Sequence, residues 1–485
     1  MEESYILSLD QGTTSSRAII YNHKGEVCAL AQREYQQIFP KANWVEHSPT
    51  DILSSQLSVA TEAVTKFGIS TSQIAAIGIT NQRETTIVWD RKTGHPVYNA
   101  IVWQDHRTSS YCNQLKSEGY TSLIKEKTGL EIDSYFSATK IKWILDNVAG
   151  ARAKADNGDL MFGTVDTWIM WNLSGQKDHI TDVSNASRTM LFNINTLQWD
   201  DDLLNLFKIP KSMLPELRMN DDKFTATSGS LLNTLIPVAA VAGDQQAAMF
   251  GQMCVDKGMA KNTYGTGCFL MMNTGSEPVV SEHRLLSTIA WNFNNETTYA
   301  LEGSVFVGGA VIQWLRDGLE LFKRTRDVEL LALHEKDNGG VFMVPAFTGL
   351  GAPYWEQDAQ GLIYGINRGT TRGHLARAAL ESIAYQSYDV IKAMEMDVGE
   401  SIKKLRVDGG ASENNLLMQF QADILDAKVE RPEILETTSL GVAYMAGLNI
   451  GFWSGIDELK TQWKQEKEFV PQMKDSQRND LIKKW

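Results

Sequence analysis

The sequence predicts an α/β protein of two blocks that flank a deep cleft. Each block opens with a strand, a turn rich in glycine and threonine, and a second strand, once at the N-terminus and again near residue 250. Helical segments with apolar residues on one face then alternate with β-rich runs, as in α/β folds. Because no low-complexity stretch separates the blocks, we expect two domains, 1–248 and 249–485, with an extensive cleft between them.

The first block begins with predicted strands at Tyr5–Leu9 and Arg17–Tyr21, on either side of a polar turn. Pro49–Lys66 places its apolar residues on one helix face. Ser48 can accept a hydrogen bond at the helix start and Pro49 suits the first helical position, so we expect the helix to begin there. The elements predicted next are strands at Ile74–Thr80 and Thr85–Trp89, a helix at Ala138–Leu145 and a mixed apolar segment at Leu160–Leu173.

The second block repeats this opening with predicted strands around Gly265-Thr266-Gly267. Two blocks with the same opening indicate a duplicated architecture. The later elements predicted in this block are a helix at Val307–Leu321, a strand at Val341–Val344, a long helix at His374–Met394, and a strand, a Gly-Gly turn and a helix over Leu405–Leu425.

Composition argues against several classes of partner. The chain carries 46 Lys and Arg against 59 Asp and Glu, a formal net charge of −13, which disfavours nonspecific binding to nucleic acid or anionic lipid. No basic region precedes the first apolar run, and the longest apolar run, Ile236–Ala242, is too short to cross a bilayer. Cys28, Cys112, Cys254 and Cys268 lack metal-binding spacing, which favours reduced thiols. We therefore expect a cytoplasmic protein without nucleic-acid binding or membrane insertion.

Several common catalytic motifs are absent from the sequence. It contains no G-x-x-x-x-G-K-[ST], no G-x-G-x-x-G after a strand, no H-E-x-x-H and no G-x-S-x-G. These absences argue against a P-loop, a Rossmann dinucleotide site, a zinc protease and a serine hydrolase.

Three turns rich in small residues are candidates for nucleotide binding. In Asp10–Arg17, small residues let backbone amides approach phosphate oxygens, Arg17 adds charge-assisted donors, and Asp10 can hold hydrated Mg²⁺. Asn262–Gly267 can wrap the opposite side, and a flat adenosine can lie on the glycines of Asp408–Asn414. Each taken alone is more simply a tight turn, but three in one α/β chain favour a nucleotide site.

Polar residues follow two further predicted strands, at the strand ends where open α/β sheets bind ligands. The segment 81–86 contains adjacent Arg83 and Glu84, which supply the donor and the acceptor that a polyol hydroxyl needs. Asp244 follows the apolar run 236–242, and a buried carboxylate there can accept a substrate hydroxyl proton during phosphoryl transfer. The simpler alternatives are a solvated Arg–Glu pair and an Asx turn or helix N-cap at Asp244.

With these residues the chain resembles bacterial glycerol kinases of the FGGY carbohydrate-kinase family. The resemblance extends from Tyr5 to about Phe452, and the Arg83-Glu84 pair is its most discriminating part. The segments that carry it are Ser8–Arg17, Ile77–Thr86, Gly243–Gln246, Lys261–Gly267, Pro345–Trp355, Arg406–Gly410 and the two general FGGY signatures, Tyr135–Asn147 and Gly361–Glu381.

The resemblance implies two actin-like, ribonuclease-H-like ATPase domains that hold ATP in the cleft and close by relative rotation. The implied reaction is ATP-dependent phosphorylation of glycerol to sn-glycerol 3-phosphate, with ATP and Mg²⁺ as cofactors. Closure would expel water and so limit futile ATP hydrolysis. A homodimer or a homotetramer is the implied assembly.

The resemblance also implies roles for individual residues. Asp244 is the implied general base, Asp10 the Mg²⁺ anchor and Arg17 a further catalytic residue. The residues implied to hold glycerol are Arg83, Glu84, Tyr135, Asp244 and Gln245, with Trp103 and Phe269 at the apolar back of the pocket. The residues implied to contact the nucleotide are Thr13, Thr14, Ser15 and Arg17 at the phosphates, and Thr266, Gly309, Gln313, Gly410 and Asn414 toward the γ-phosphate, ribose and base.

Two other functions share parts of this pattern. A kinase for another small polyol or ketose would have every ATP motif, and only Arg83, Glu84 and Tyr135 argue against it. A non-kinase actin-like ATPase would use Asp244 and Arg83 only for structure. A substrate panel separates the first alternative, and replacement of Asp244 separates the second.

Overall fold

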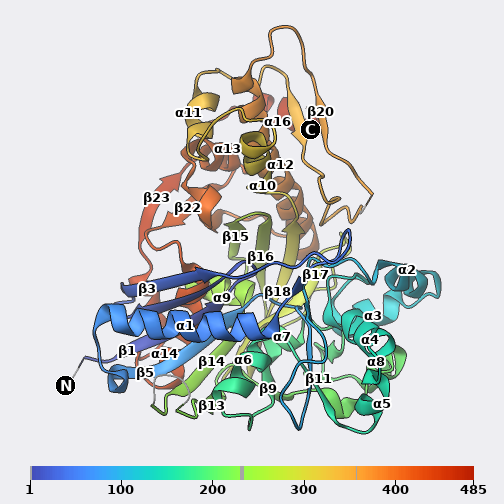
Figure 1. The fold of residues 1–485 in the computed structure, drawn as a ribbon. Coiled ribbons are helices and arrows are strands. Elements are labelled where there is room, and N and C mark those ends of the chain that lie inside the picture. Colours follow the sequence, from blue (N-terminus) through green and yellow to red (C-terminus); the bar gives the residue numbers. More distant parts are fainter. Residues whose placement is uncertain (1–2, 230–233, 357) are drawn as a thin grey trace.

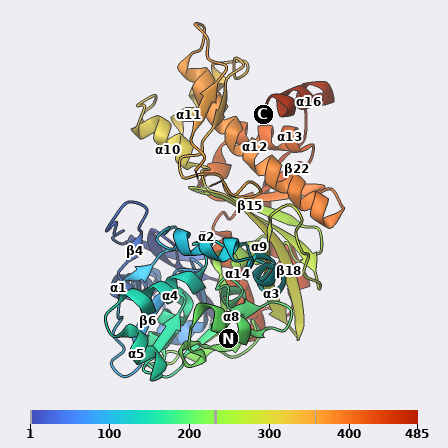
Figure 2. The same ribbon diagram turned by 90° about the vertical axis from the view of Figure 1, so that its right-hand side faces the viewer.

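The two blocks fold into two lobes, each with its own mixed β-sheet and hydrophobic core (Figure 1). The structure is a computed structural model that describes residues 3–229, 234–356 and 358–485. The N-terminal lobe lies at the bottom and the C-terminal lobe at the top in both views (Figures 1 and 2). The predicted α/β architecture of two blocks is therefore confirmed.

The sheet of the N-terminal lobe has six strands in the order β13-β14-β5-β1-β2-β3. Strands β1, β5 and β14 are parallel, whereas β2 is antiparallel to both β1 and β3. The strand bounds are β1 (Tyr5–Gln11), β2 (Ser15–Tyr21), β3 (Val27–Glu34), β5 (Ile74–Asn81), β13 (Thr225–Ala226) and β14 (Pro237–Gly243). The sequence did not indicate β3, because this edge strand buries only Ala31 and so lacks a clear apolar alternation.

The sheet of the C-terminal lobe has seven strands in the order β17-β18-β16-β15-β21-β22-β23. Its opening strand β15 is antiparallel to β16 and parallel to β21, just as β1 is antiparallel to β2 and parallel to β5. This shared pairing confirms the duplicated architecture. The strand bounds are β15 (Ala260–Tyr264), β16 (Cys268–Gly275), β17 (Leu286–Phe293), β18 (Glu296–Val305), β21 (Lys404–Asp408), β22 (Lys428–Pro432) and β23 (Gln465–Phe469).

Helix α1 (Pro49–Phe67) packs on β1, β2 and β3 and begins where the sequence predicts (Figure 1). The Ser48 hydroxyl accepts a hydrogen bond from the Asp51 amide at 3.2 Å, and Pro49 occupies the first helical position. Gly68 ends the helix in the left-handed conformation, with φ of 74°. The apolar face predicted from the sequence is the face that is buried on the sheet.

Two helices connect the lobes. Helix α9 (Asp244–Gly251) follows β14, and helix α14 (Thr437–Asn449) returns from the second block to pack on α9 and on β1, β5 and β14 of the first lobe. A late segment of the chain therefore completes the N-terminal lobe. The domain division at residues 248 and 249, which falls inside α9, stays a prediction.

The remaining helices match the predictions in part. Helix α12 (Arg372–Val398) contains the predicted long helix. Helix α10 (Ala310–Asp317) starts later than predicted, because Gly308 and Gly309 form a turn before it, and it ends at Asp317, before Gly318. The other bounds are β4 (Glu46–His47), β6 (Ile87–Asp90), β7 (Ala100–Ile101), α2 (Ser109–Ser117), α3 (Thr121–Thr128), α4 (Ser137–Asn147), α5 (Ala151–Asp156), β8 (Leu160–Gly163), α6 (Val165–Leu173), β9 (Ile180–Asp182), α7 (Val183–Ala186), β10 (Phe192–Asn193), β11 (Gln198–Trp199), α8 (Asp201–Phe207), β12 (Glu216–Arg218), α11 (Asp327–Leu333), β19 (Phe342–Val344), β20 (Leu362–Tyr364), α13 (Asn415–Leu425), α15 (Ile456–Gln462) and α16 (Asp475–Lys484). Within the described ranges, no helix combines the length and the apolar character needed to cross a membrane.

The contact between α9 and α14 depends on two glycines. A Cβ atom at Gly441 would lie 1.8 Å from the Ala247 carbonyl oxygen, and one at Gly251 would lie 2.0 Å from the Thr437 carbonyl oxygen. We expect Gly441→Ala to lower the free energy of unfolding by about 1–3 kcal/mol, because the helices must separate to admit the methyl group. Urea titration monitored by circular dichroism measures the change. The matched control is Gly455→Ala, which adds its methyl group to open space, and an equal loss in both variants would contradict the packing argument.

Candidate active site

The carboxyl ends of three parallel strands bring the predicted polar residues to one edge of the N-terminal sheet. Asp10 at the end of β1 pairs in register with Thr80 of β5, and Thr80 pairs with Ala242 of β14. The chain leaves β5 into Gln82-Arg83-Glu84 and leaves β14 into Asp244 at this same edge. Such an edge is where open α/β sheets bind ligands.

Side chains donate hydrogen bonds to the carbonyl oxygens of the turn at residues 12–15, here called the phosphate turn. The Tyr35 hydroxyl donates to the carbonyls of Gly12 and Thr13 at 2.6 and 2.8 Å, and the Gln37 side chain donates to Thr13 at 3.1 Å. The Trp103 indole donates to the Thr13 hydroxyl at 2.9 Å. Of the other predicted phosphate contacts, Ser15 is buried and Thr14 is exposed. With its carbonyls held, the turn can offer backbone amides to an anion.

Asp10 and Arg17 are direct cross-strand neighbours on β1 and β2, so their side chains share one face of the sheet. Burial raises the pKa of Asp10 to about 7, although Arg17 acts in the opposite direction. The Arg17 guanidinium, about one-third exposed, donates to Glu436 at 2.8 Å. Glu436 directly precedes α14 and was not identified from the sequence. A neighbouring cation favours the ionised form of the Asp10 carboxylate. A single ionised carboxylate suits a metal ion that takes its other ligands from phosphate and water.

Arg83 joins the strand ends of β5 and β14. Its Nε lies 3.0 Å from Oδ1 of Asp244, and Arg83 is 2 % exposed whereas the Asp244 side chain is 28 % exposed. Burial raises the pKa of Asp244, although Arg83 and Lys261 lower it. Glu84 is buried beside Arg83 and has a φ of 60°, which is uncommon for a residue with a side chain. Uncommon backbone geometry of this kind is concentrated at functional sites.

Three aromatic side chains form a wall next to these polar groups. The Trp103 ring lies 5.6 Å from the Tyr135 ring and 5.9 Å from the Phe269 ring. Lys140, from the first FGGY signature, is fully buried and donates to the Tyr135 carbonyl oxygen. Trp103 also contacts the phosphate turn, so the aromatic wall adjoins that turn through Trp103.

Gln245 follows Asp244 at the start of α9 and is also buried. Its side-chain oxygen accepts a hydrogen bond from Lys261 of β15, which also donates to the Thr263 hydroxyl at 2.8 Å. Lys261 belongs to the C-terminal lobe, so this contact crosses between the lobes. Lys261 belongs to the segment Lys261–Gly267 that resembles the family, but no role was predicted for it from the sequence.

Two further buried ionic residues, Arg188 and Glu302, complete the surroundings of Arg83. Glu302 accepts two hydrogen bonds from Arg83, and Arg188 donates to both Glu302 and Glu84. Sequence reasoning missed both residues. The only signal for Glu302 is one carboxylate inside the otherwise uncharged run 297–314, where a buried strand is followed by an apolar helix.

The predicted base and ribose contacts line one cavity in the C-terminal lobe. This cavity has a volume of about 550 Å³ and opens beside the aligned ends of β15 and β21, where Thr263 pairs with Asp408. All five predicted residues line it, namely Thr266, Gly309, Gln313, Gly410 and Asn414. No hydrogen bond within the described part of the chain joins this cavity to the phosphate turn of the other lobe.

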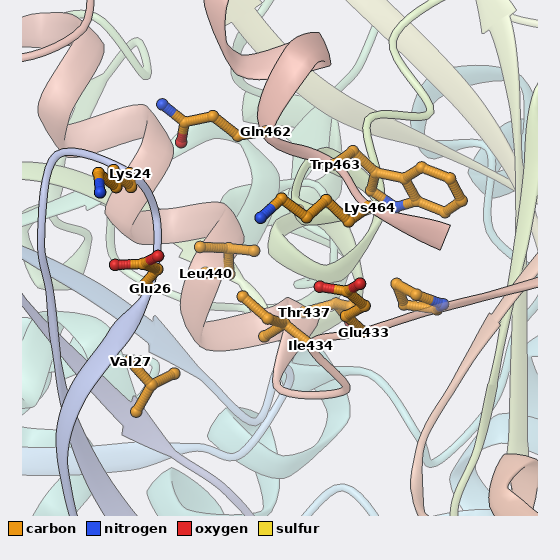
Figure 3. A pocket seen from close by; sticks show the side chains of 12 residues that line it. Lys24, Glu26, Val27, Glu433, Ile434, Thr437, Leu440, Gln462, Trp463 and Lys464 are labelled. Atoms are coloured by element: carbon orange, nitrogen blue, oxygen red, sulfur yellow. The ribbon is translucent and has the colours of Figure 1, made fainter. Parts of the chain in front are cut away.

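A second cavity, of about 310 Å³, lies between the turn after β2 and the segments around α14 and β23 (Figure 3). Its lining combines the apolar side chains of Leu440 and Trp463 with charges of both signs, such as Lys24 and Glu433. The residues predicted for glycerol and nucleotide lie elsewhere. The strand edge at Asp10, Arg83 and Asp244 is therefore the better candidate for catalysis.

Comparison with known proteins agrees with this geometry. Residues 5–251 match the N-terminal domain of the FGGY family of carbohydrate kinases and residues 260–450 match its C-terminal domain. The chain is 58 % identical over 485 residues to a protein named Glycerol kinase from Burkholderia pseudomallei, covering 100 % of this chain and 97 % of that one. It is 60 % identical over 481 residues to one of the same name from Parabacteroides distasonis, covering 99 % and 96 %.

Solved structures give the same result for the fold. The crystal structure of Plasmodium falciparum glycerol kinase with ADP superposes with a TM-score of 0.93 at 37 % identity, covering 100 % of this chain and 97 % of that one. A xylulose kinase from Lactobacillus acidophilus has a TM-score of 0.88 at 22 % identity over 99 % and 96 %, which is evidence for the fold alone. The predicted two-domain actin-like fold is confirmed. The chain belongs to the FGGY family of carbohydrate kinases.

Proposed function

We propose that the protein transfers the γ-phosphoryl group of ATP to a terminal hydroxyl of glycerol and forms sn-glycerol 3-phosphate. The observation that carries this proposal is the 3.0 Å ion pair between Arg83 and Asp244, at the strand edge that also bears Asp10. The relatives named Glycerol kinase, at 58–60 % identity over nearly the whole chain, support it. The ADP in the related Plasmodium falciparum structure supports nucleotide use.

Glycerol lies between the polar and aromatic groups in this proposal. Arg83 donates to one hydroxyl and Glu84 accepts from one, while the rings of Trp103, Tyr135 and Phe269 pack against the carbon chain. Asp244 accepts the proton of the attacking hydroxyl. Because burial raises the pKa of Asp244, its carboxylate is a stronger base than an exposed aspartate. Most of the remaining catalysis is positioning and charge neutralisation.

The phosphates of ATP lie at the phosphate turn in this proposal, where Arg17 exchanges its contact with Glu436 for a phosphate oxygen. Asp10 holds Mg²⁺, which supplies charge neutralisation on the phosphates when bound. Across the described residues no cluster of three or more His, Cys, Asp or Glu is arranged to bind a metal. One carboxylate suits Mg²⁺ because this ion keeps water and phosphate as ligands.

The adenosine lies in the cavity at Gly410, so residues 249–485 bind the base and ribose. Residues 1–248 bind the phosphates and supply every glycerol contact except Phe269. A Cβ atom at Gly410 would meet no other atom within 4 Å, so a larger side chain there would occupy the cavity without straining the fold. We expect Gly410→Val to lower kcat/KM for ATP about 10- to 200-fold, with the KM for glycerol unchanged. Initial-rate kinetics measure both constants. The control is Gly455→Val, also into open space, and equal losses in the two variants would contradict this placement.

The proposed function is tested by coupled detection of ADP formed from ATP and Mg²⁺ in the presence of glycerol, dihydroxyacetone, xylulose or gluconate. The expected result is ADP formation that depends on an acceptor and has its highest kcat/KM with glycerol. A preference for xylulose or gluconate would favour the ketose or sugar-acid alternative. ADP release at the same rate without any acceptor would favour the non-kinase ATPase. A homodimer or homotetramer and a cytoplasmic location stay predictions.

A further inference from the structure

A buried ring of four charged side chains lies behind the proposed glycerol site. Arg83 donates through Nη1 and Nη2 to the two oxygens of Glu302, at 2.5 and 2.9 Å. Arg188 donates through Nη2 to Glu302 at 2.9 Å and through Nε to Oε1 of Glu84 at 2.7 Å. Glu84 closes the ring at 3.9 Å from Nε of Arg83. All four side chains are at most 2 % exposed.

The members of this charged ring come from three distant parts of the chain. Arg83 and Glu84 follow β5, Arg188 follows α7, and Glu302 lies on β18 of the other sheet between Met271 and Leu286 in register. The ring therefore attaches the end of β5 to the C-terminal lobe.

The ring determines which atoms of Arg83 and Glu84 can serve a ligand. Glu302 engages both terminal nitrogens of Arg83, so that the Nε edge faces Asp244. Arg188 engages Oε1 of Glu84, and in the described part of the chain no hydrogen bond uses Oε2. Oε2 of Glu84 is thereby left as an acceptor whose position is fixed through the other oxygen.

Arg188 also supports the aromatic wall. Its guanidinium carbon lies 5.6 Å from the Tyr135 ring centre and 5.4 Å from that of Phe136. Its third nitrogen, Nη1, is buried without a hydrogen-bond partner in the described structure. Unsatisfied buried donors of this kind are rare and call for an explanation. Buried ion pairs in general contribute little net stability relative to apolar residues of equal volume.

We infer that Arg188 and Glu302 are positioning residues for glycerol, Arg188 acting through Glu84 and Glu302 acting through Arg83. This inference rests on the proposed function, and neither residue needs to touch the substrate. Each fixes one oxygen or one guanidinium edge, so the hydroxyl-binding atoms are already oriented when glycerol arrives.

The decisive variant is Arg188→Lys. Lysine keeps the charge, but its single nitrogen cannot reproduce the fork that reaches Glu84 and Glu302 together. The expected result is a KM for glycerol raised about 10- to 100-fold, the range for loss of a hydrogen bond to a charged group, with the KM for ATP unchanged. The matched control is Arg107→Lys. The Arg107 side chain is fully buried and bridges Glu46 and Asp105 at 2.7 and 2.8 Å outside this ring. The control is expected to lower thermal stability without raising the KM for glycerol.

A double-mutant cycle with Glu84→Gln tests how Arg188 acts. If Arg188 works through Glu84, Arg188→Lys adds nothing to the glycerol KM in the Glu84→Gln background. Equal effects in the two backgrounds, or a loss of thermal stability alone as in Arg107→Lys, would overturn the inference. Should Arg188→Lys not fold, Glu302→Gln keeps the shape of the ring and tests the branch through Arg83. A raised KM for glycerol with an unchanged KM for ATP is expected, and a loss of thermal stability alone would overturn the inference. Failure of the proposed function can be distinguished from failure of this inference, because in that case the wild-type protein itself would show no glycerol-dependent ADP formation.

Discussion

Replacement of Asp244 by asparagine is expected to lower kcat about 10²- to 10⁴-fold, the range for loss of a general base. Asparagine has nearly the shape of aspartate but cannot accept the hydroxyl proton. The KM for ATP is expected to stay unchanged, because this substitution leaves both the adenosine cavity of the other lobe and the phosphate turn intact. Glycerol-dependent ADP formation under saturating substrates measures the loss.

Thermal unfolding provides the control for this variant. Because burial raises the pKa of Asp244, the ionised carboxylate is disfavoured in the folded state, so Asp244→Asn is expected to keep or slightly raise the melting temperature. Arg83 also retains its two hydrogen bonds to Glu302. Full activity in a folded Asp244→Asn protein would favour the non-kinase ATPase over the kinase.

Replacement of Arg83 by methionine is expected to lower the free energy of unfolding at pH 8 by about 3–5 kcal/mol, the usual cost of removing one partner of a buried ion pair. Methionine fills much of the same volume but leaves Glu302 and Asp244 without their shared cation. Glycerol binding is also expected to be lost, since Arg83 donates to a hydroxyl in the proposed complex. Chemical denaturation and calorimetric titration with glycerol measure the two effects.

The stability deficit of Arg83→Met is expected to shrink as the pH falls. In the wild-type protein Arg188 and Arg83 keep the pKa of Glu302 below its ordinary value despite burial. Without Arg83, only Arg188 offsets the burial of Glu302, and the pKa values of Glu302 and Asp244 both rise. The folded variant then binds protons that the unfolded chain does not bind, so its stability increases from pH 8 toward pH 5 relative to wild type. A deficit independent of pH would contradict this account, and Arg83→Lys, which keeps the charge, is expected to show a smaller deficit.

The sequence predicted the parts of the fold that depend on local patterns. The start of α1 at Ser48 and Pro49 and the long helix α12 follow from capping chemistry and apolar periodicity. The edge strand β3 carries no such pattern, because only one of its residues is buried. The apolar pattern of helix α10 extends back to Val307 in the sequence, but Gly308 and Gly309 form a turn there. The helix therefore starts later than predicted.

The site was predicted only where its residues follow strand ends or resemble a known motif. Asp10 lies at the end of a strand, Arg83 and Asp244 each follow one, and the parallel pairing of β1, β5 and β14 aligns them. Arg188 and Glu302 do not have this signal, since Glu302 lies within a strand and meets Arg83 across 219 positions of sequence. Contacts over such separations depend on how the sheets pack, which local periodicity does not specify.

In the proposed complex, one small polyol lies between Arg83, Glu84 and Asp244 and faces the phosphate turn. A crystal structure of the protein with glycerol and ADP tests this placement. The account predicts density for glycerol within hydrogen-bond distance of these three side chains, with one terminal hydroxyl beside the Asp244 carboxylate and directed toward residues 12–15. Glycerol bound away from this strand edge, or with no hydroxyl near Asp244, would contradict it.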